Sequence, residues 1–284
     1  MNLLRSVVAE QEEQIKANEW SVRIEKMPVN SGLPAVRQHG VTLASANYVA
    51  HVDSDDWVEP DFLECLYNET RKKECDIVFC DSFKDDGYVR EVCQRFDTFD
   101  GYALHLMRRM MLTSELGNVW GALYRRELFR PPYTPPTCNM GEDLATNIQV
   151  LYLCVHPVSW VRRPLYHYFY NSESISRCEN ESNMLKNFHS LHGNVDVLDA
   201  FFLRLGLSSE YSNELASLRL WACRPLTPLL LSRKYYRLWR THTDAIDVKI
   251  VFNFSLPISV RVHYMLSWLR IAPILSKIKH SRKR

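Results

Sequence analysis

The sequence has few features that would assign it to a membrane-spanning, secreted or nucleic-acid-binding class. Its 284 residues contain no run approaching the roughly 18 uninterrupted apolar residues of a bilayer-spanning helix. Its start lacks the basic segment and apolar core of a signal peptide. Its formal net charge is only +2, which argues against a nucleic-acid partner. We therefore expect a cytoplasmic globular protein.

Paired cysteines, repeats and low-complexity tracts are also missing. None of the eight cysteines belongs to a Cys-x-x-Cys pair, so reduced, buried thiols in a cytosolic protein are the simplest interpretation. No internal repeat is visible. The hydrophobic share of 46% and the charged share of 24% allow one large domain or two modest ones.

The strongest positive feature is a strand pattern that ends abruptly in acids. The segment Tyr48–Trp57 begins with apolar residues and then places Asp53, Asp55 and Asp56 within four positions. Carboxylates so close repel one another, and Asp53 and Asp55 can face a common point. A hard cation with oxygen ligands, Mg2+ or Mn2+, fits such a pair best. The alternative is a solvated turn in which Asp55 or Asp56 caps a helix that starts near Pro60.

The segments around these acids give them a family context. Upstream, Asn30, Gly32 and Arg37 form an Asn-x-Gly-x-x-x-x-Arg stretch, and Trp57–Asp61 follows the acids. Further on, Gly141-Glu142-Asp143 opens a predicted helix. In their order and spacing, these motifs resemble the family 2 glycosyltransferases of the GT-A fold.

The resemblance covers roughly residues 1–177 and implies an α/β protein whose mostly parallel sheet is flanked by helices. It also implies metal-dependent, inverting transfer of a sugar from a nucleotide-diphosphate donor, such as a UDP-sugar. The acceptor would be a hydroxyl of a glycan or a lipid-linked glycan, and the cofactor Mg2+ or Mn2+. A nucleotidyltransferase is disfavoured because no glycine-rich phosphate loop accompanies the acids.

The resemblance further assigns roles to single residues. Asp143 is expected to be the catalytic base. The local sequence alone also allows an alternative, in which Asp143 only caps the helix. Its neighbour Glu142 can raise the pKa of Asp143 by like charge, whereas the helix dipole can hold Asp143 ionised. The metal is expected at Asp53 and Asp55. The donor is expected to contact six residues: Asn30, Gly32, Arg37, Asp53, Ser176 and Arg177.

The start of the chain departs from the family pattern. Family members begin with a strand, a helix and a second strand that hold the nucleotide base. This chain instead opens on a helical pattern, Leu3–Ile15. The glycosyltransferase domain, residues 1–178, therefore looks N-terminally truncated. This departure leaves a second function open, a catalytically inactive remnant that only binds partners.

Apolar periodicity predicts the elements of this domain. Helices are expected at residues 33–46, 61–73 and 143–154, and residues 81–99 form a polar hairpin or loop. Strands are expected at residues 22–24, 48–53, 75–80 and 118–124, and residues 158–170 form an extended, aromatic-rich segment. Because strands and helices alternate, a parallel sheet follows.

Residues 179–284 have a different character. Apolar residues at helical spacing predict helices over 185–198 and 215–231, the second interrupted by Pro225 and Pro228. Residues 263–284 combine apolar residues and Trp268 with many lysines and arginines. Such a tail can lie in a membrane interface and contact anionic lipid, which would place the protein at the inner face of the membrane. The alternative is a docked helix followed by a basic end.

Overall fold

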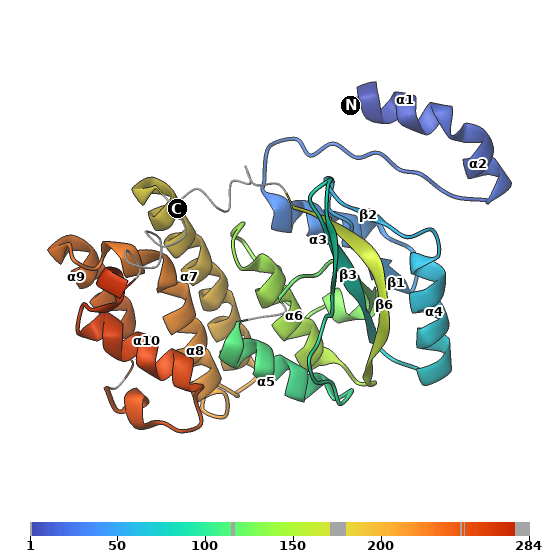
Figure 1. Cartoon of the computed structure of the whole chain (residues 1–284). Helices are drawn as coiled ribbons and strands as arrows, with labels where there is room; N and C mark the ends of the chain where they lie inside the picture. Colours follow the sequence, from blue (N-terminus) through green and yellow to red (C-terminus); the bar gives the residue numbers. More distant parts are fainter. Residues whose placement is uncertain (1, 115–116, 171–179, 245, 247, 276–284) are drawn as a thin grey trace.

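The structure is a computed structural model that describes residues 2–114, 117–170, 180–244, 246 and 248–275. A curled sheet lies between α4 on one side and α5 and α6 on the other (Figure 1). The C-terminal helices continue outward from α6, with α9 and α10 farthest from the sheet. The α/β class predicted from the sequence is confirmed.

The sheet has six strands, and five of them follow the spatial order β1-β5-β3-β6-β2, while β4 also pairs with β3. The strands are β1 (Tyr48–Ala50), β2 (Trp57–Val58), β3 (Ile77–Asp85), β4 (Arg90–Cys93), β5 (Ala122–Arg125) and β6 (Val158–Phe169). Only β3 and β6 pair in parallel among these strands, and the other four pairs are antiparallel. The prediction of a mostly parallel sheet is therefore wrong.

The route of the chain explains this mixed pairing. β3 is followed directly by its antiparallel partner β4. The chain then re-enters the sheet at β5, which runs opposite to β3. β1, β3 and β6 still run the same way, because β5 lies antiparallel between β1 and β3. Apolar periodicity indicates that a strand is buried, but it does not indicate the direction of the strand.

Both faces of the sheet are buried by helices, as expected for a central strand such as β3. On one face, α4 (Phe62–Lys73) packs Phe62 and Leu66 against Val78. On the other, Ile77 and Phe79 join the core formed with α5 (Ala103–Thr113) and α6 (Glu142–Leu153). Alternate residues of β3 therefore bury opposite faces of the sheet.

The N-terminal segment stands apart from this core. α1 (Asn2–Glu10) and α2 (Glu12–Ala17) break the predicted helix Leu3–Ile15 at Gln11, and they lie away from the sheet (Figure 1). The predicted strand at residues 22–24 is wrong, because this stretch is largely exposed and pairs with no described strand. The predicted helix at 33–46 is confirmed as α3 (Leu33–Leu43).

The C-terminal region is helical, as predicted. It consists of α7 (Glu181–Arg204), α8 (Ser212–Ala222), α9 (Arg233–Thr243) and α10 (Ile258–Trp268), with short 3-10 helices at Arg224–Leu229 and Val248–Phe252. α7 and α8 share a core with α5 and α6, and a second core forms around Trp239 and Tyr264. Within the described residues, no helix is both long and apolar enough to cross a membrane. The seven described cysteines are free thiols.

Candidate active site

The acids that follow β1 form a tight turn, Asp53–Asp56, called here the acidic turn. The backbone N–H of Asp56 donates to the carbonyl oxygen of Asp53 at 3.1 Å, which closes the turn. Asp55 lies exposed at its tip and has no hydrogen-bond or ion-pair partner among the described residues. A free carboxylate at the tip of a fixed turn is suited to binding a cation.

Tyr166 of β6 fixes the acidic turn. Its hydroxyl accepts from the backbone N–H of Asp53 at 3.1 Å and donates to the carboxylate of Asp56 at 2.6 Å. The second Asp56 oxygen accepts from the backbone N–H of Phe169 at 2.8 Å. Asp56 therefore anchors the turn to the sheet. The alternative in which Asp55 or Asp56 caps the next helix is wrong, because α4 begins after Asp61.

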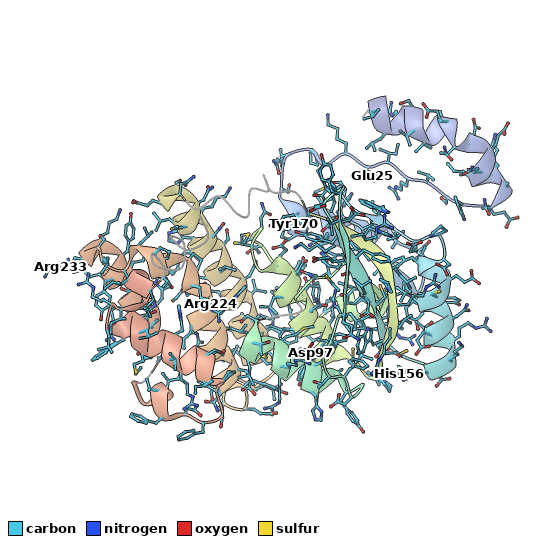
Figure 2. All side chains as sticks on the ribbon, viewed as in Figure 1. Glu25, Asp97, His156, Tyr170, Arg224 and Arg233 are labelled. Atoms are coloured by element: carbon cyan, nitrogen blue, oxygen red, sulfur yellow. The ribbon has the colours of Figure 1, made fainter. Side chains whose placement is uncertain are left out.

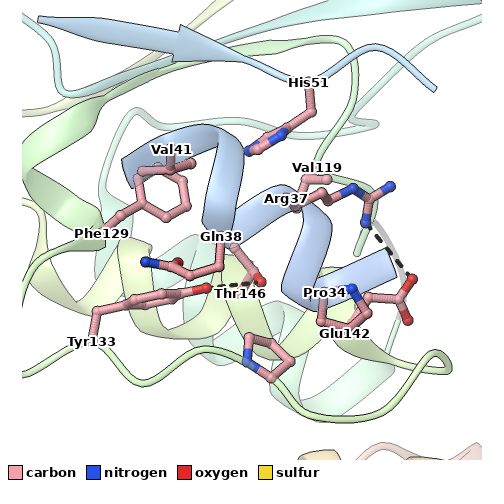
Figure 3. A pocket seen from close by; sticks show the side chains of 11 residues that line it. Pro34, Arg37, Gln38, Val41, His51, Val119, Phe129, Tyr133, Glu142 and Thr146 are labelled. Carbon is pink, nitrogen blue, oxygen red and sulfur yellow. Dashed lines mark hydrogen bonds and ion pairs between the residues drawn. The ribbon is translucent and has the colours of Figure 1, made fainter. Parts of the chain in front are cut away.

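Arg37 of α3 joins this turn to the start of α6. Its guanidinium donates to Asp53 at 2.7 Å, forms an ion pair with Asp143, and lies 3.7 Å from Glu142. Figure 3 shows Arg37 and Glu142 facing each other at the edge of a small cavity between α3 and α6. Only 14% of the Arg37 side chain is exposed, so these ion pairs are largely shielded from water.

The loop before α3 explains two of the predicted residues. Gly32 has φ = 81°, a conformation that favours glycine, and a Cβ atom there would clash with the Asn139 side chain. Asn139 Oδ1 in turn accepts from the N–H of Leu33 at 3.1 Å at the first residue of α3. Asn30 closes the loop by accepting from the Gly32 N–H at 3.3 Å. Asn30 and Gly32 thus set the start of the helix that carries Arg37.

The acids at the start of α6 have altered pKa values. Burial raises the pKa of Asp143, although the Arg37 guanidinium and a hydrogen bond from the Val119 N–H, 3.2 Å long, act in the opposite direction. Burial, aided by the neighbouring Asp143 charge, raises the pKa of Glu142 to about 7. Burial also lowers the pKa of His51 to about 4. The raised pKa makes the Asp143 carboxylate a stronger proton acceptor than a solvent-exposed aspartate.

The raised pKa of Glu142 predicts a pH-dependent stability. Its pKa rises from 4.5 in the unfolded chain to about 7 on folding, so the folded state holds a proton that the unfolded chain releases. Stability from Glu142 is therefore full below pH 4.5 and is lost as the pH rises toward 7. Between about pH 5 and about pH 8, the free energy of unfolding of wild type should fall by on the order of 2 kcal/mol more than that of Glu142→Gln. Urea unfolding of both proteins at the two pH values measures this difference, and parallel pH profiles would contradict it.

The structure brings together residues that are far apart in the sequence. Arg37, Asp53 and Asp143 form one ion-pair network, and Asp55 lies on the same turn as Asp53. The catalytic, metal-binding and donor-binding roles of these residues stay predictions. The predicted donor contacts Ser176 and Arg177 lie outside the described residues.

Sequence reasoning missed the residues that hold the site in shape. Tyr166 occupies a segment predicted to be extended and aromatic-rich, whose pattern gives no sign of contact with residues more than a hundred positions away. Asn139 lies in a loop with no recognisable motif. Asp56 was visible only as one of three neighbouring acids. These contacts depend on the tertiary arrangement, which local periodicity does not encode.

The fold and the site together define a class. A mixed sheet covered by helices on both faces, with an acidic turn after one strand and paired acids opening a nearby helix, is consistent with the GT-A fold. Residues 6–131 match the model for Glycosyl transferase family 2. This part of the chain is therefore similar to that family.

Two curated relatives are similar to part of the chain. The glycosyltransferase GlyA of Streptococcus pneumoniae is 32% identical over 169 residues, which cover 55% of this chain and 23% of GlyA. The putative glycosyltransferase EpsH of Bacillus subtilis is 32% identical over 155 residues, which cover 51% of this chain and 44% of EpsH. The chain thus spans less than half of the length of either relative.

A solved structure supports the fold. Residues 1–349 of S. aureus TarS, crystallised in complex with UDP-GlcNAc, align with a TM-score of 0.50 and 16% identity. The alignment covers 84% of this chain and 78% of the TarS chain. At this identity the similarity shows the GT-A fold alone.

Proposed function

We propose that this protein transfers a sugar from a UDP-sugar to a hydroxyl of a glycan or lipid-linked acceptor, with inversion at the anomeric carbon. The observation that carries the proposal is the Arg37 network, which holds Asp53 of the acidic turn next to Asp143 at the start of α6. The same site thereby contains two carboxylates suited to a metal and one suited to a base. The UDP-GlcNAc complex of TarS supports a nucleotide-sugar donor.

The acidic turn fits Mg2+ or Mn2+. Asp55 is exposed and unpaired among the described residues, and Asp53 Oδ2 has no hydrogen-bond partner there. No group of three or more His, Cys, Asp or Glu side chains in the described residues is arranged to hold a metal. Two carboxylates would therefore share the ion with diphosphate oxygens and water, a common arrangement for Mg2+. A bound cation acts as a Lewis acid that stabilises the departing diphosphate.

Asp143 is the proposed general base. As the acceptor oxygen forms a bond to the anomeric carbon, the bond from that carbon to the donor phosphate oxygen breaks and its electron pair leaves with the diphosphate. The acceptor proton passes to Asp143, because burial gives this carboxylate a raised pKa. Arg37 stabilises the ionised form that must be present before the proton arrives. An inactive remnant is not favoured, because the chain keeps Asp53, Asp55 and Asp143 together at one site.

The proposal also covers the acceptor and the place of the reaction in the cell. We place the reaction in polysaccharide assembly at the cytoplasmic face of the membrane, where nucleotide-sugar donors meet lipid-linked acceptors. The acidic turn lies within residues 6–131, which match the family 2 model, and the start of α6 follows them in the chain.

Replacement of Asp55 tests the metal role directly. Asp55→Asn removes a charged oxygen ligand and should weaken UDP binding in Mn2+ by about tenfold or more. Asp97→Asn, at an exposed loop acid, is the matched control and should bind UDP like wild type. Titration calorimetry measures all three affinities. If wild type binds UDP equally well in EDTA and in Mn2+, the proposed metal site is wrong.

A further inference from the structure

The helix α10 is apolar on two opposite faces. One face packs into the second core through Val260 and Tyr264. The other carries four exposed residues at intervals of three or four positions, which places them along one stripe: Ile258, Val262, Met265 and Leu269. Ile258 is 71% exposed. A helix of a soluble domain normally has charged or polar residues on its outer face, so this stripe requires an explanation.

Further exposed aromatic residues lie beside the stripe. Phe254 is 83% exposed, and the Arg261 guanidinium lies 4.8 Å from the centre of its ring. Trp268 at the end of α10 is also exposed. The stripe, Phe254 and Trp268 are together called the α10 surface. In Figure 1, α10 lies on the outer side of the C-terminal helices, away from the sheet.

The charge of the chain is distributed very unevenly. Residues 1–214 contain 21 basic residues (Lys and Arg) and 31 acidic ones (Asp and Glu). Residues 215–284 contain 14 basic residues and two acidic ones. Residues 248–284, which include α10, contain eight Lys and Arg and no Asp or Glu. Figure 2 shows Arg224 and Arg233 on the same side of the molecule as the C-terminal helices. The exposed apolar surface therefore belongs to the strongly basic part of an otherwise acidic chain.

We propose that the α10 surface docks on a lipid bilayer that contains anionic headgroups. The apolar stripe and the aromatic rings enter the boundary between headgroups and acyl chains, and the flanking cations contact the headgroups. The bilayer therefore contacts one defined side of the protein.

A second copy of the chain fits this surface less well. Symmetric docking of two α10 surfaces would bring together two copies that each carry Arg261 and Arg270 and no acid among residues 248–275. A nucleic acid would bind the cationic side chains but would leave the apolar stripe exposed to water. An anionic bilayer satisfies both features at once.

Vesicle sedimentation of the full chain tests the proposal. Wild type should partition onto vesicles of phosphatidylcholine mixed with phosphatidylglycerol, much less onto phosphatidylcholine alone, and less at high salt. The double variant Ile258→Gln/Met265→Gln should lose about tenfold or more of this partitioning. The control variant Leu63→Gln/Val92→Gln changes two exposed apolar residues on α4 and β4 and should bind like wild type.

Two results would overturn the proposal. One is equal partitioning of wild type and the α10 variant onto anionic vesicles while both keep the wild-type melting temperature. The other is a dimer in vesicle-free buffer, measured by light scattering, that the α10 variant abolishes. The second result would assign the surface to a partner copy of the chain. Neither result bears on the UDP binding tested at the acidic turn.

Discussion

Asp143→Asn is expected to reduce turnover of a UDP-sugar by about 100-fold to 10,000-fold, the range for a lost general base. The amide keeps the shape of the carboxylate and can still accept the hydrogen bond from the Val119 N–H. The amide cannot take up the proton that the acceptor hydroxyl releases. UDP affinity in Mn2+ should stay within about threefold of wild type, because the acidic turn is unchanged.

Release of UDP in steady state, together with calorimetry of UDP binding, separates these two effects. Asp196→Asn, at an exposed acid on α7, is the matched control and should turn over like wild type. A variant that loses UDP affinity and turnover together would place Asp143 in binding. Wild-type turnover by Asp143→Asn would remove this residue from the mechanism.

Arg37→Met is expected to destabilise the fold by about 3 kcal/mol, because it leaves partly buried carboxylates without their counter-charge. Asp53 and Asp143 each lose an ion pair, and Glu142 loses a nearby cation. Mn2+ can offset part of this negative charge. It should therefore raise the melting temperature of Arg37→Met by more than it raises that of wild type.

Urea unfolding with and without Mn2+ measures both effects. The matched control is Arg163→Met, which breaks the ion pair with Asp61 at a side chain that is 51% exposed. Exposed pairs contribute little, so this variant should lose no more than about 1 kcal/mol. Equal losses in the two variants would show that the Arg37 network does not stabilise the fold.

The sequence was sufficient to single out the acids of the candidate site, whose chemical roles stay predictions. Asp53 and Asp55 follow an apolar strand pattern, and Asp143 opens a helix, so each had a local signal. The ion pairs of Arg37 with Asp53 and Asp143 had no local signal in the sequence. They depend on α3 and α6 approaching the end of β1 in three dimensions.

The residues that shape the site were beyond the reach of local patterns. Tyr166 holds the acidic turn through two hydrogen bonds, yet its sequence position indicates only an extended, aromatic-rich segment. The direction of β5 was equally hidden, because it follows from the hairpin of β3 and β4. The strand expected at residues 22–24 had a suitable apolar pattern, but pairing also requires a neighbouring edge.

The most direct test of the account is a crystal structure of the full chain with Mn2+ and UDP. We expect an anomalous manganese peak within bonding distance of the Asp53 or Asp55 carboxylate, with the diphosphate bound to the same ion. We also expect Asp143 to stay beside Arg37, with no direct bond to the metal. UDP bound away from the acidic turn, or bound there without manganese, would contradict the central claim.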